Sequence, residues 1–497
     1  MNFRHKNQTR LAIFSRRWLC YSLFPLLLCG GFPSFTAAAD DALPQLGTAG
    51  VQALSIAKER QYGDAFMRMS RASGGIINDP VLTDFINQLG YRLVSNADGV
   101  RFPFHFFLVN DPTINAAAFL GGYVKVNSGL FLYAQSESEL AAVLAHEISH
   151  VTQRHIARSI ENAAQNNHLT IAGLLGSVIL SIANPAAGIA AMQTSIAASI
   201  QGKINFTRQN EEEADRIGMQ VLARSGFKPS AMATFFGRLA SKYRYTTKPP
   251  EILADHPLTA NRIADAQARA SQYPNKYVAP DLDFQLAKSR IQVRFGTMDA
   301  EQALSEFKHQ LQTQQYVLRD AALYGEALAL FAEKNYQEAQ KIIEDLAHRY
   351  PENLFFLDTQ SDILLAMNQT AQAIKLLNTT RQRLPDNPVV ILNLAVAYDQ
   401  AKQYAKEAQL LDHYLRTHPD QILAWQMLTE SYQRQQLDGK ALQSQAEYFA
   451  LRGQYQLAIK RLQSATFQDN NRLDEARIKA RIEQFKVAQA DLDKLQN

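Results

Sequence analysis

Predominantly apolar segments just after position 100 predict a short sheet. Phe104 to Asn110 reads as one strand. Ala116 to Leu120 and Tyr123 to Asn127 flank Gly121-Gly122, a pair that is typical of a hairpin turn. An exposed strand of such a sheet can pair with an extended peptide through backbone hydrogen bonds. We therefore expect residues 40 to about 275 to form an α+β domain.

A helix is expected directly after this hairpin. Residues 137–145 contain no Gly or Pro and are rich in helix formers. Ser136, followed three positions later by Glu139, predicts a capping box at the start of the helix. The segment Gln209–Leu222 predicts a second helix, with three consecutive acidic residues, Glu211 to Glu213, near its start.

The C-terminal part of the chain repeats with a period of 34 residues. Pro351, Pro385 and Pro419 keep this spacing. Three more columns share it: Leu323, Leu357, Ile391 and Trp425; Leu330, Leu364, Tyr398 and Tyr432; Ala327, Ser361, Ala395 and Thr429. Helix pairs of this length, with Pro closing the second helix, resemble tetratricopeptide repeats. Such repeats stack into a curved array with a concave, partner-binding face.

The stretch Leu169–Ile200 is apolar, rich in small residues and free of charge. Asn184-Pro185 divides it into two pieces, each shorter than a membrane span. We expect a buried helical hairpin near the functional site, one that could make contact with a membrane surface. A hairpin inserted into the membrane is the alternative.

The first 39 residues resemble a secretory signal. A basic start precedes the apolar run Trp18–Leu28, and Ala37-Ala38-Ala39 offers a small-residue cleavage site near Ala39. A retained membrane anchor is less favoured, because the run is short and Pro25 interrupts it. A lipoprotein signal at Cys29 is less favoured, because Leu28 is not a small residue.

Removal of this segment changes the charge of the protein. The first 39 residues hold five of the 51 Lys and Arg and none of the 47 Asp and Glu, so residues 40–497 have a formal net charge of −1. Nothing in this balance favours nucleic acid as a partner. Cys20 and Cys29 are the only cysteines, so the rest of the chain suits an oxidising compartment and excludes Cys-ligated zinc.

The sequence His-Glu-Ile-Ser-His at positions 146–150 matches the pattern H-E-x-x-H. On a helix, His146 and His150 point the same way and can bind one metal ion together. Glu147 lies about 100° further round the helix and can reach a water molecule on that ion. These residue types predict a metallopeptidase site.

A catalytic zinc ion usually takes three protein ligands and leaves a fourth position for water. His155 would face away from His146, because residues 151–154 should continue the helix. We therefore expect His155 to be a surface or packing residue. Glu211 is the better candidate, because it lies on a stripe of small and apolar residues where an unpaired charge would be costly. Its stripe holds Ala214, Asp215, Gly218 and Leu222, whereas Glu212 and Glu213 point elsewhere.

Two further residues of this helix have expected roles. Asp215 could hydrogen-bond an imidazole ligand and fix its tautomer. Gly218 would let the second helix approach the first closely.

His-Glu-Ile-Ser-His on one helix and Glu-Glu-Glu-Ala-Asp-Arg-Ile-Gly on a later one resemble gluzincin peptidases related to the CAAX prenyl protease and HtpX. In that family the motif is Glu-x-x-Ala-Asp and its first Glu binds zinc, which corresponds to Glu211 here. The membrane-spanning segments of those relatives are not recognisable in this chain. With the signal and the repeats, the resemblance implies a periplasmic protein. It would degrade unfolded or stalled outer-membrane β-barrel proteins and help the β-barrel assembly machinery to assemble others.

The segment His256-Pro257-Leu258, followed by Arg262, resembles the family's His-Pro-Leu-x-x-x-Arg segment. Pro257 favours an extended or turn conformation at His256. His256 could be a structural residue, stabilise the developing oxyanion, or occupy the fourth zinc position. The resemblance implies the last of these, a latent state that excludes water.

We therefore predict an α+β zincin-like metallopeptidase domain followed by an all-α tetratricopeptide-repeat array. The expected division is a signal peptide at residues 1–39, a peptidase domain at 40–275, and a linker with repeats at 276–497. The expected enzyme is a zinc metalloendopeptidase with one Zn²⁺ per chain, held by His146, His150 and Glu211. The alternative is a chaperone or assembly scaffold in which the zinc site is mostly latent.

Overall fold

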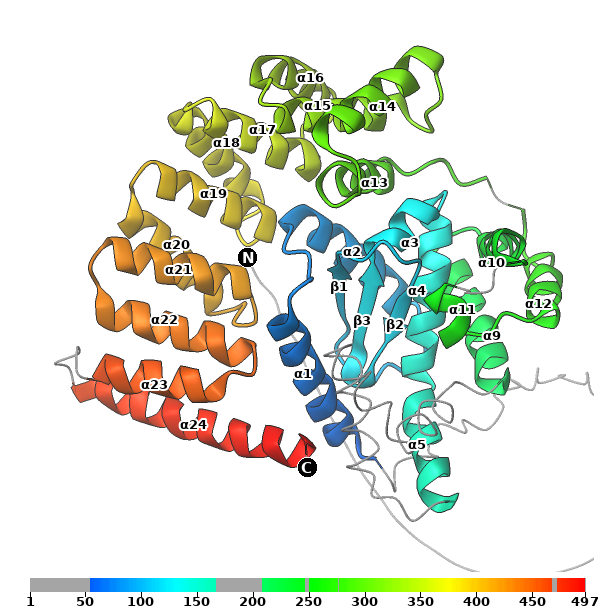
Figure 1. Cartoon of the computed structure of the whole chain (residues 1–497), viewed down its shortest axis with the longest axis horizontal. Coiled ribbons are helices and arrows are strands. Elements are labelled where there is room, and N and C mark those ends of the chain that lie inside the picture. Colours follow the sequence, from blue (N-terminus) through cyan, green and yellow to red (C-terminus); the bar gives the residue numbers. More distant parts are fainter. Residues whose placement is uncertain (1–53, 167–207, 246–249, 276, 467–471, 497) are drawn as a thin grey trace, which may run out of the picture. The chain divides into compact units, whose positions relative to one another are not determined.

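The computed structural model describes residues 54–166, 208–245, 250–275, 277–466 and 472–496 (Figure 1). The predicted signal at residues 1–39 and the apolar stretch Leu169–Ile200 lie outside these ranges.

Three strands form one sheet, in the order β1-β3-β2. They are β1 (His105–Val109), β2 (Ala116–Ala118) and β3 (Tyr123–Asn127). β3 pairs in parallel with β1, with Lys125 opposite Phe107, and antiparallel with β2, with Lys125 opposite Ala117. The strand and the hairpin that the sequence predicts are therefore confirmed.

The hairpin turns through the short 3-10 helix η2 (Leu120–Gly122). Gly121 and Gly122 have φ angles of 75° and 87°, a region that residues with a Cβ rarely adopt. A Cβ on Gly122 would also lie 2.4 Å from the carbonyl oxygen of Pro103. Both glycines are therefore needed for the turn that brings β2 beside β3.

The predicted metal-binding helix is α4 (Glu137–Thr152), which is buried along almost its whole length. Ser136 caps it, because its hydroxyl accepts a hydrogen bond from the backbone N–H of Glu139. The Glu139 side chain does not complete the predicted capping box. It accepts from the N–H of Gln135 and pairs with Arg238 instead.

Helix α9 (Arg208–Arg224) packs directly against α4. Gly218 lies at the crossing, where a Cβ would be 3.1 Å from the backbone of Ala145 and His146. The expected close approach of the two helices is therefore confirmed.

Further helices surround the sheet and this helix pair (Figure 1). They are α1 (Ile56–Ser73), α2 (Pro80–Val94), α3 (Ser128–Tyr133), α5 (His155–Asn166), α10 (Ser230–Tyr243), α11 (Glu251–Asp255) and α12 (Ala260–Ala270).

Beyond position 281 the described chain is helical. Its elements are α13 (Leu282–Arg294), α14 (Ala300–Thr313), α15 (Arg319–Ala332), α16 (Tyr336–Arg349), α17 (Leu354–Ala366), α18 (Thr370–Arg383), α19 (Pro388–Gln400), α20 (Tyr404–Leu415), α21 (Ile422–Arg434), α22 (Asp438–Leu451), α23 (Tyr455–Thr466) and α24 (Arg472–Gln496). Sequence neighbours among them pack pairwise, and the small residues of the 34-residue column are buried.

One apolar core joins the sheet to the first repeat helices. Phe131 of α3 stacks on Phe284 of α13, and Phe85 of α2 meets Phe355 of α17 edge to face. Within the described ranges, none of the helices combines the length and apolarity needed to cross a bilayer.

Candidate metal centre

Helix α4 carries the first two candidate ligands on one face, four residues apart. The Nε2 atoms of His146 and His150 are 2.9 Å apart, and both rings are buried. The two nitrogens therefore face a common point, as the H-E-x-x-H spacing predicts.

Helix α9 brings Glu211 to the same point. Its Oε2 lies 3.5 Å from Nε2 of His146, and its Oε1 lies 3.4 Å from Nε2 of His150. Burial would raise the pKa of Glu211, but His256 and His146 hold it far below its usual value. A charged carboxylate is thus held among imidazole nitrogens.

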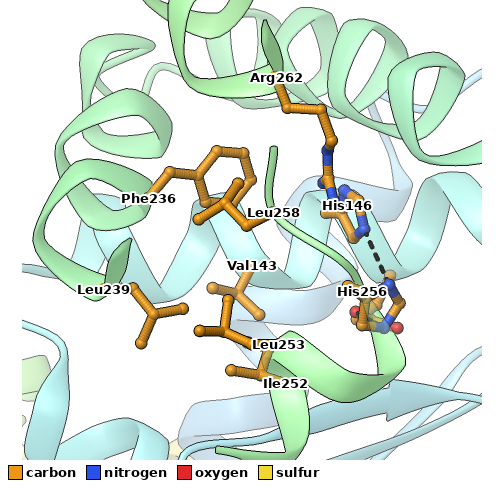
Figure 2. A pocket seen from close by; sticks show the side chains of 10 residues that line it. Val143, His146, Phe236, Leu239, Ile252, Leu253, His256, Leu258 and Arg262 are labelled. Atoms are coloured by element: carbon orange, nitrogen blue, oxygen red, sulfur yellow. Dashed lines mark hydrogen bonds and ion pairs between the residues drawn. The ribbon is translucent and has the colours of Figure 1, made fainter. Parts of the chain in front are cut away.

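His256 supplies a fourth ligand atom from the end of α11. Its Nδ1 lies 3.3 Å from Nε2 of His146 (Figure 2). The same atom lies 3.1 Å from Oε1 of Glu211. Although burial opposes the charge on this ring, Glu147 and Glu211 raise the pKa of His256.

These four side chains fit a single divalent cation. One ligand atom from each of His146, His150, Glu211 and His256 lies within 4.8 Å of all the others, and all four residues are buried. Lone pairs and negative charge that converge away from water are costly unless a cation or a proton compensates them. A set of nitrogen and carboxylate donors without sulfur is suited to zinc and to similar divalent ions.

Glu147 lies beside this group and not in it. Its Oε2 accepts a hydrogen bond from the backbone N–H of Ala118 in β2, at 2.9 Å. Its Oε1 is 3.4 Å from Nε2 of His256. Burial raises the pKa of Glu147, with His256 and His146 opposing this effect. The carboxyl group can therefore hold a proton next to the metal-binding atoms.

Asp215 and Arg262 support the ligands from the other side. Oδ1 of Asp215 lies 2.9 Å from Nδ1 of His146. Arg262 donates to both oxygens of Asp215, at 2.7 and 2.8 Å, and lies 2.8 Å from Oε2 of Glu211. Burial disfavours a charged His146, but Asp215 and Glu211 raise its pKa to about 10.

The role of Arg262 is not predicted from the sequence. Glu211 and Asp215 are buried carboxylates one turn apart on α9, and they need a cation besides the metal. The pair could therefore have indicated that a basic side chain lies close by. Arg262 also donates to the carbonyl oxygen of Pro257, at 2.9 Å. It therefore ties the His256 segment to the helix that carries Glu211.

The expected continuation of the helix through residues 151–154 is wrong, although His155 is a buried residue outside the four candidate ligands. Helix α4 ends at Thr152, Arg154 has a φ of 55°, and α5 begins at His155. The chain therefore breaks where continued helix was expected, and His155 is buried with Nδ1 2.8 Å from Nδ1 of His150. Glu213 does point away from the metal group, toward His155.

A pocket of mainly apolar character adjoins the candidate ligands (Figure 2). Its polar lining is His146, Glu147, His256 and Arg262. Its apolar lining is Val143, Phe236, Leu239, Ile252, Leu253 and Leu258.

Comparison with known proteins supplies two family matches. Residues 82–270 match the sequence model of peptidase family M48, and residues 364–431 match that of the tetratricopeptide repeat. These matches confirm the predicted fold class, a metallopeptidase domain followed by an all-helical repeat array.

Several curated relatives extend along nearly the whole chain. The "Beta-barrel assembly-enhancing protease" of Escherichia coli (strain K12) is 44% identical over 92% of this chain and 93% of its own length. The protein of the same name from Yersinia pestis is 44% identical over 90% and 92%. A more distant relative, the yeast "Mitochondrial metalloendopeptidase OMA1", is 30% identical over 33% of this chain and 46% of its own length.

Proposed function

We propose that this chain, which belongs to the β-barrel assembly-enhancing proteases of peptidase family M48, is a zinc-dependent endopeptidase. Its substrates would be outer-membrane β-barrel proteins that fail to assemble. His146, His150 and Glu211 would hold the ion, and Glu147 would be the catalytic base. The single observation that carries the proposal is the convergence of four buried ligand atoms within 4.8 Å of one another.

A zinc ion bound there would lower the pKa of a coordinated water and polarise the scissile carbonyl group. The chain's own contribution is proton transfer and orientation. Glu147 would accept a proton at Oε1 and pass it to the leaving amine. The Ala118 N–H that donates to Oε2 holds the carboxyl group in place for both transfers.

His256 would keep this site latent. Its Nδ1 faces the other ligand atoms, and its Nε2 faces Glu147. A fourth protein ligand closes a zinc site to water, so cleavage requires the His256 side chain to move away. Arg262 is part of the same device, because it bonds both the carbonyl oxygen of Pro257 and Asp215.

The apolar pocket beside the ligands supports the substrate class. Strands of outer-membrane barrels alternate apolar and polar residues, so an extended, unassembled strand presents an apolar side chain at every second position. Val143, Phe236 and Leu239 offer such a side chain an apolar surface next to the site. The repeats would recruit these substrates, or the β-barrel assembly machinery, in the periplasm. Export would depend on the predicted signal at residues 1–39.

A chaperone or assembly scaffold is the second candidate. The position of His256 among the ligand atoms favours a scaffold, because a metal site closed by four protein ligands does not cleave. Binding by the repeats would then be the activity that remains. In a cell that lacks the gene, Glu147→Gln separates the two functions. Full restoration of barrel assembly by this variant would assign the essential role to binding.

The proposal is tested with purified protein and an unfolded outer-membrane β-barrel protein as substrate. We expect the wild-type chain to cleave it and Glu147→Gln to retain its metal while losing at least 10²-fold in rate. His146→Ala should lose both metal and cleavage. Cleavage by Glu147→Gln at the wild-type rate would contradict the proposed mechanism.

A further inference from the structure

His155 and Glu213 form a chain of contacts behind His150, outside the four candidate ligands. Nδ1 of His155 is 2.8 Å from Nδ1 of His150, and Nε2 of His155 is 3.0 Å from Oε2 of Glu213. His155 is fully buried, whereas the Glu213 side chain is 25% exposed.

The backbone is shaped to bring His155 back to His150. Arg154 adopts a left-handed φ of 55°, an unfavourable conformation for a residue with a side chain. Its buried guanidinium donates to Oε1 of Glu59, at 2.7 Å, and to the carbonyl oxygen of Leu54, at 2.6 Å. These contacts hold the break between α4 and α5 that places His155 beside His150.

If His150 binds a metal through Nε2, the donor and the acceptor of each hydrogen bond in this chain of contacts are fixed. Nδ1 of His150 then carries the proton and donates to Nδ1 of His155. Nε2 of His155 consequently carries its own proton and donates to Glu213. One arrangement of protons therefore satisfies all three groups while both rings remain neutral.

Glu213 is itself held in place. Arg158, in the next turn of α5, donates to Oε2 of Glu213 at 3.0 Å and to Oδ1 of Asn210 at 3.2 Å. The contacts therefore join α5 to α9, the helix that also carries Glu211.

The other imidazole ligand is supported differently. Nδ1 of His146 faces the carboxylate of Asp215 directly, at 2.9 Å. The neutral ring of His155 lies between His150 and the carboxylate of Glu213. His146 is therefore hydrogen-bonded to a charged group, whereas His150 is hydrogen-bonded to a neutral one. In metal sites, partners of this kind orient the ligand and alter affinity by about 10–100-fold.

We propose that His155 and Glu213 are positioning residues that fix the tautomer and orientation of His150 and thereby slow the release of the bound divalent ion. This inference rests on the proposed function, because it requires His150 to be a metal ligand. It assigns a task to two residues that the cleavage mechanism does not use.

The test measures the rate at which zinc-loaded protein releases its ion to a colorimetric chelator. In His155→Asn, the side-chain oxygen takes the place of Nδ1 and can accept from His150. His155→Phe fills the space without an acceptor. We expect Phe to speed release by about 10–100-fold and Asn to remain closer to the wild type.

Glu213→Gln extends the test to a partly exposed position, where the variant chain is expected to fold. It should release zinc faster than the matched control Glu212→Gln, whose exposed side chain lies one residue away. Circular dichroism confirms that each chain is folded.

Two results would overturn the proposal. One is release from His155→Phe at the slow wild-type rate, which would assign His155 to packing alone. The other is release from Glu213→Gln that is no faster than from Glu212→Gln, which would show that Glu213 does not act on His150 through His155. Wild-type protein that binds no zinc, or binding that is indifferent to His150→Ala, would instead overturn the proposed function and this inference with it.

Discussion

At the scale of single residues, His256→Ala should raise the rate of cleavage, because it removes the side chain that fills the fourth position around the ion. The rate is measured on an unfolded β-barrel substrate, with zinc content determined in parallel. His309→Ala, in α14, serves as the control. An unchanged or lower rate at equal zinc content would contradict the latch.

The spacing of chemical groups along a helix predicts most of the candidate centre. His146 and His150 follow from their separation, and Glu211 follows from its phase on a small, apolar stripe. His155 could not be predicted in the same way. Its position depends on the left-handed Arg154, and that conformation depends on Glu59, which is 95 residues away in sequence.

At the scale of secondary structure, the hydrophobic pattern predicts the strand, the hairpin and the helical repeats, because each pattern is local. The capping box predicted at α4 forms only in part. Ser136 caps the helix, but the Glu139 side chain pairs with Arg238. A four-residue motif cannot predict a contact between segments so far apart in sequence.

Gly218→Val tests the close crossing of α4 and α9. The new side chain would meet the backbone of Ala145 and His146 and push α9 away, which moves Glu211 from the two imidazoles. We expect a loss of about 1–3 kcal/mol in stability, together with weaker zinc binding. Gly237→Val in α10 is the matched control, because a Cβ there meets no atom within 4 Å.

Denaturant unfolding and zinc titration of both variants give the comparison. Equal zinc affinity in the Gly218 and Gly237 variants would show that the helix crossing does not set the position of Glu211.

Glu407 in α20 should make the repeats less stable as pH rises. Burial raises the pKa of Glu407 from its ordinary 4.5 to about 7, an effect that Ser431 and Arg434 oppose and Asp399 and Glu430 reinforce. Between these two values the unfolded chain has lost the proton that the folded chain keeps. The free energy of unfolding therefore falls as pH increases from 4.5 to 7.

Glu407→Gln removes this dependence. We expect it to stabilise the protein by about 2 kcal/mol at pH 8 and to change little near pH 5. Thermal melts at both pH values, beside the exposed control Glu333→Gln at the end of α15, measure the effect. A destabilised variant at pH 8 would contradict the sign.

At the scale of the whole molecule, the sequence predicts two successive domains but not how they are joined. The boundary near residue 275 remains a prediction. The structure joins the sheet and the first repeats through one apolar core and through Arg290, which is almost fully buried. Its guanidinium lies 2.8 Å from Asp79, the cap of α2, and 2.7 Å from Asp358 in α17. The contact between Arg290 and Asp79 joins residues 211 positions apart, and it leaves no periodic signal in the sequence.

Arg290→Met should lower the stability of the chain by about 3–5 kcal/mol, because it removes the buried cation that Asp79 and Asp358 share. Arg294, 3.6 Å from Asp79, would remain beside that carboxylate. Denaturant unfolding measures the loss. Arg383→Met, which removes an exposed pair with Glu352, should change little. Equal unfolding midpoints for the two variants would show that Arg290 does not stabilise the contact between α2 and the repeats.

The most direct test of the account is the zinc content of the purified chain, measured by elemental mass spectrometry after gel filtration. We predict one zinc ion per wild-type chain, its retention in Glu212→Ala, and its loss in Glu211→Ala. A folded wild-type chain without zinc, or a Glu211→Ala chain that keeps its full complement, would contradict the central claim that these helices hold one ion between them.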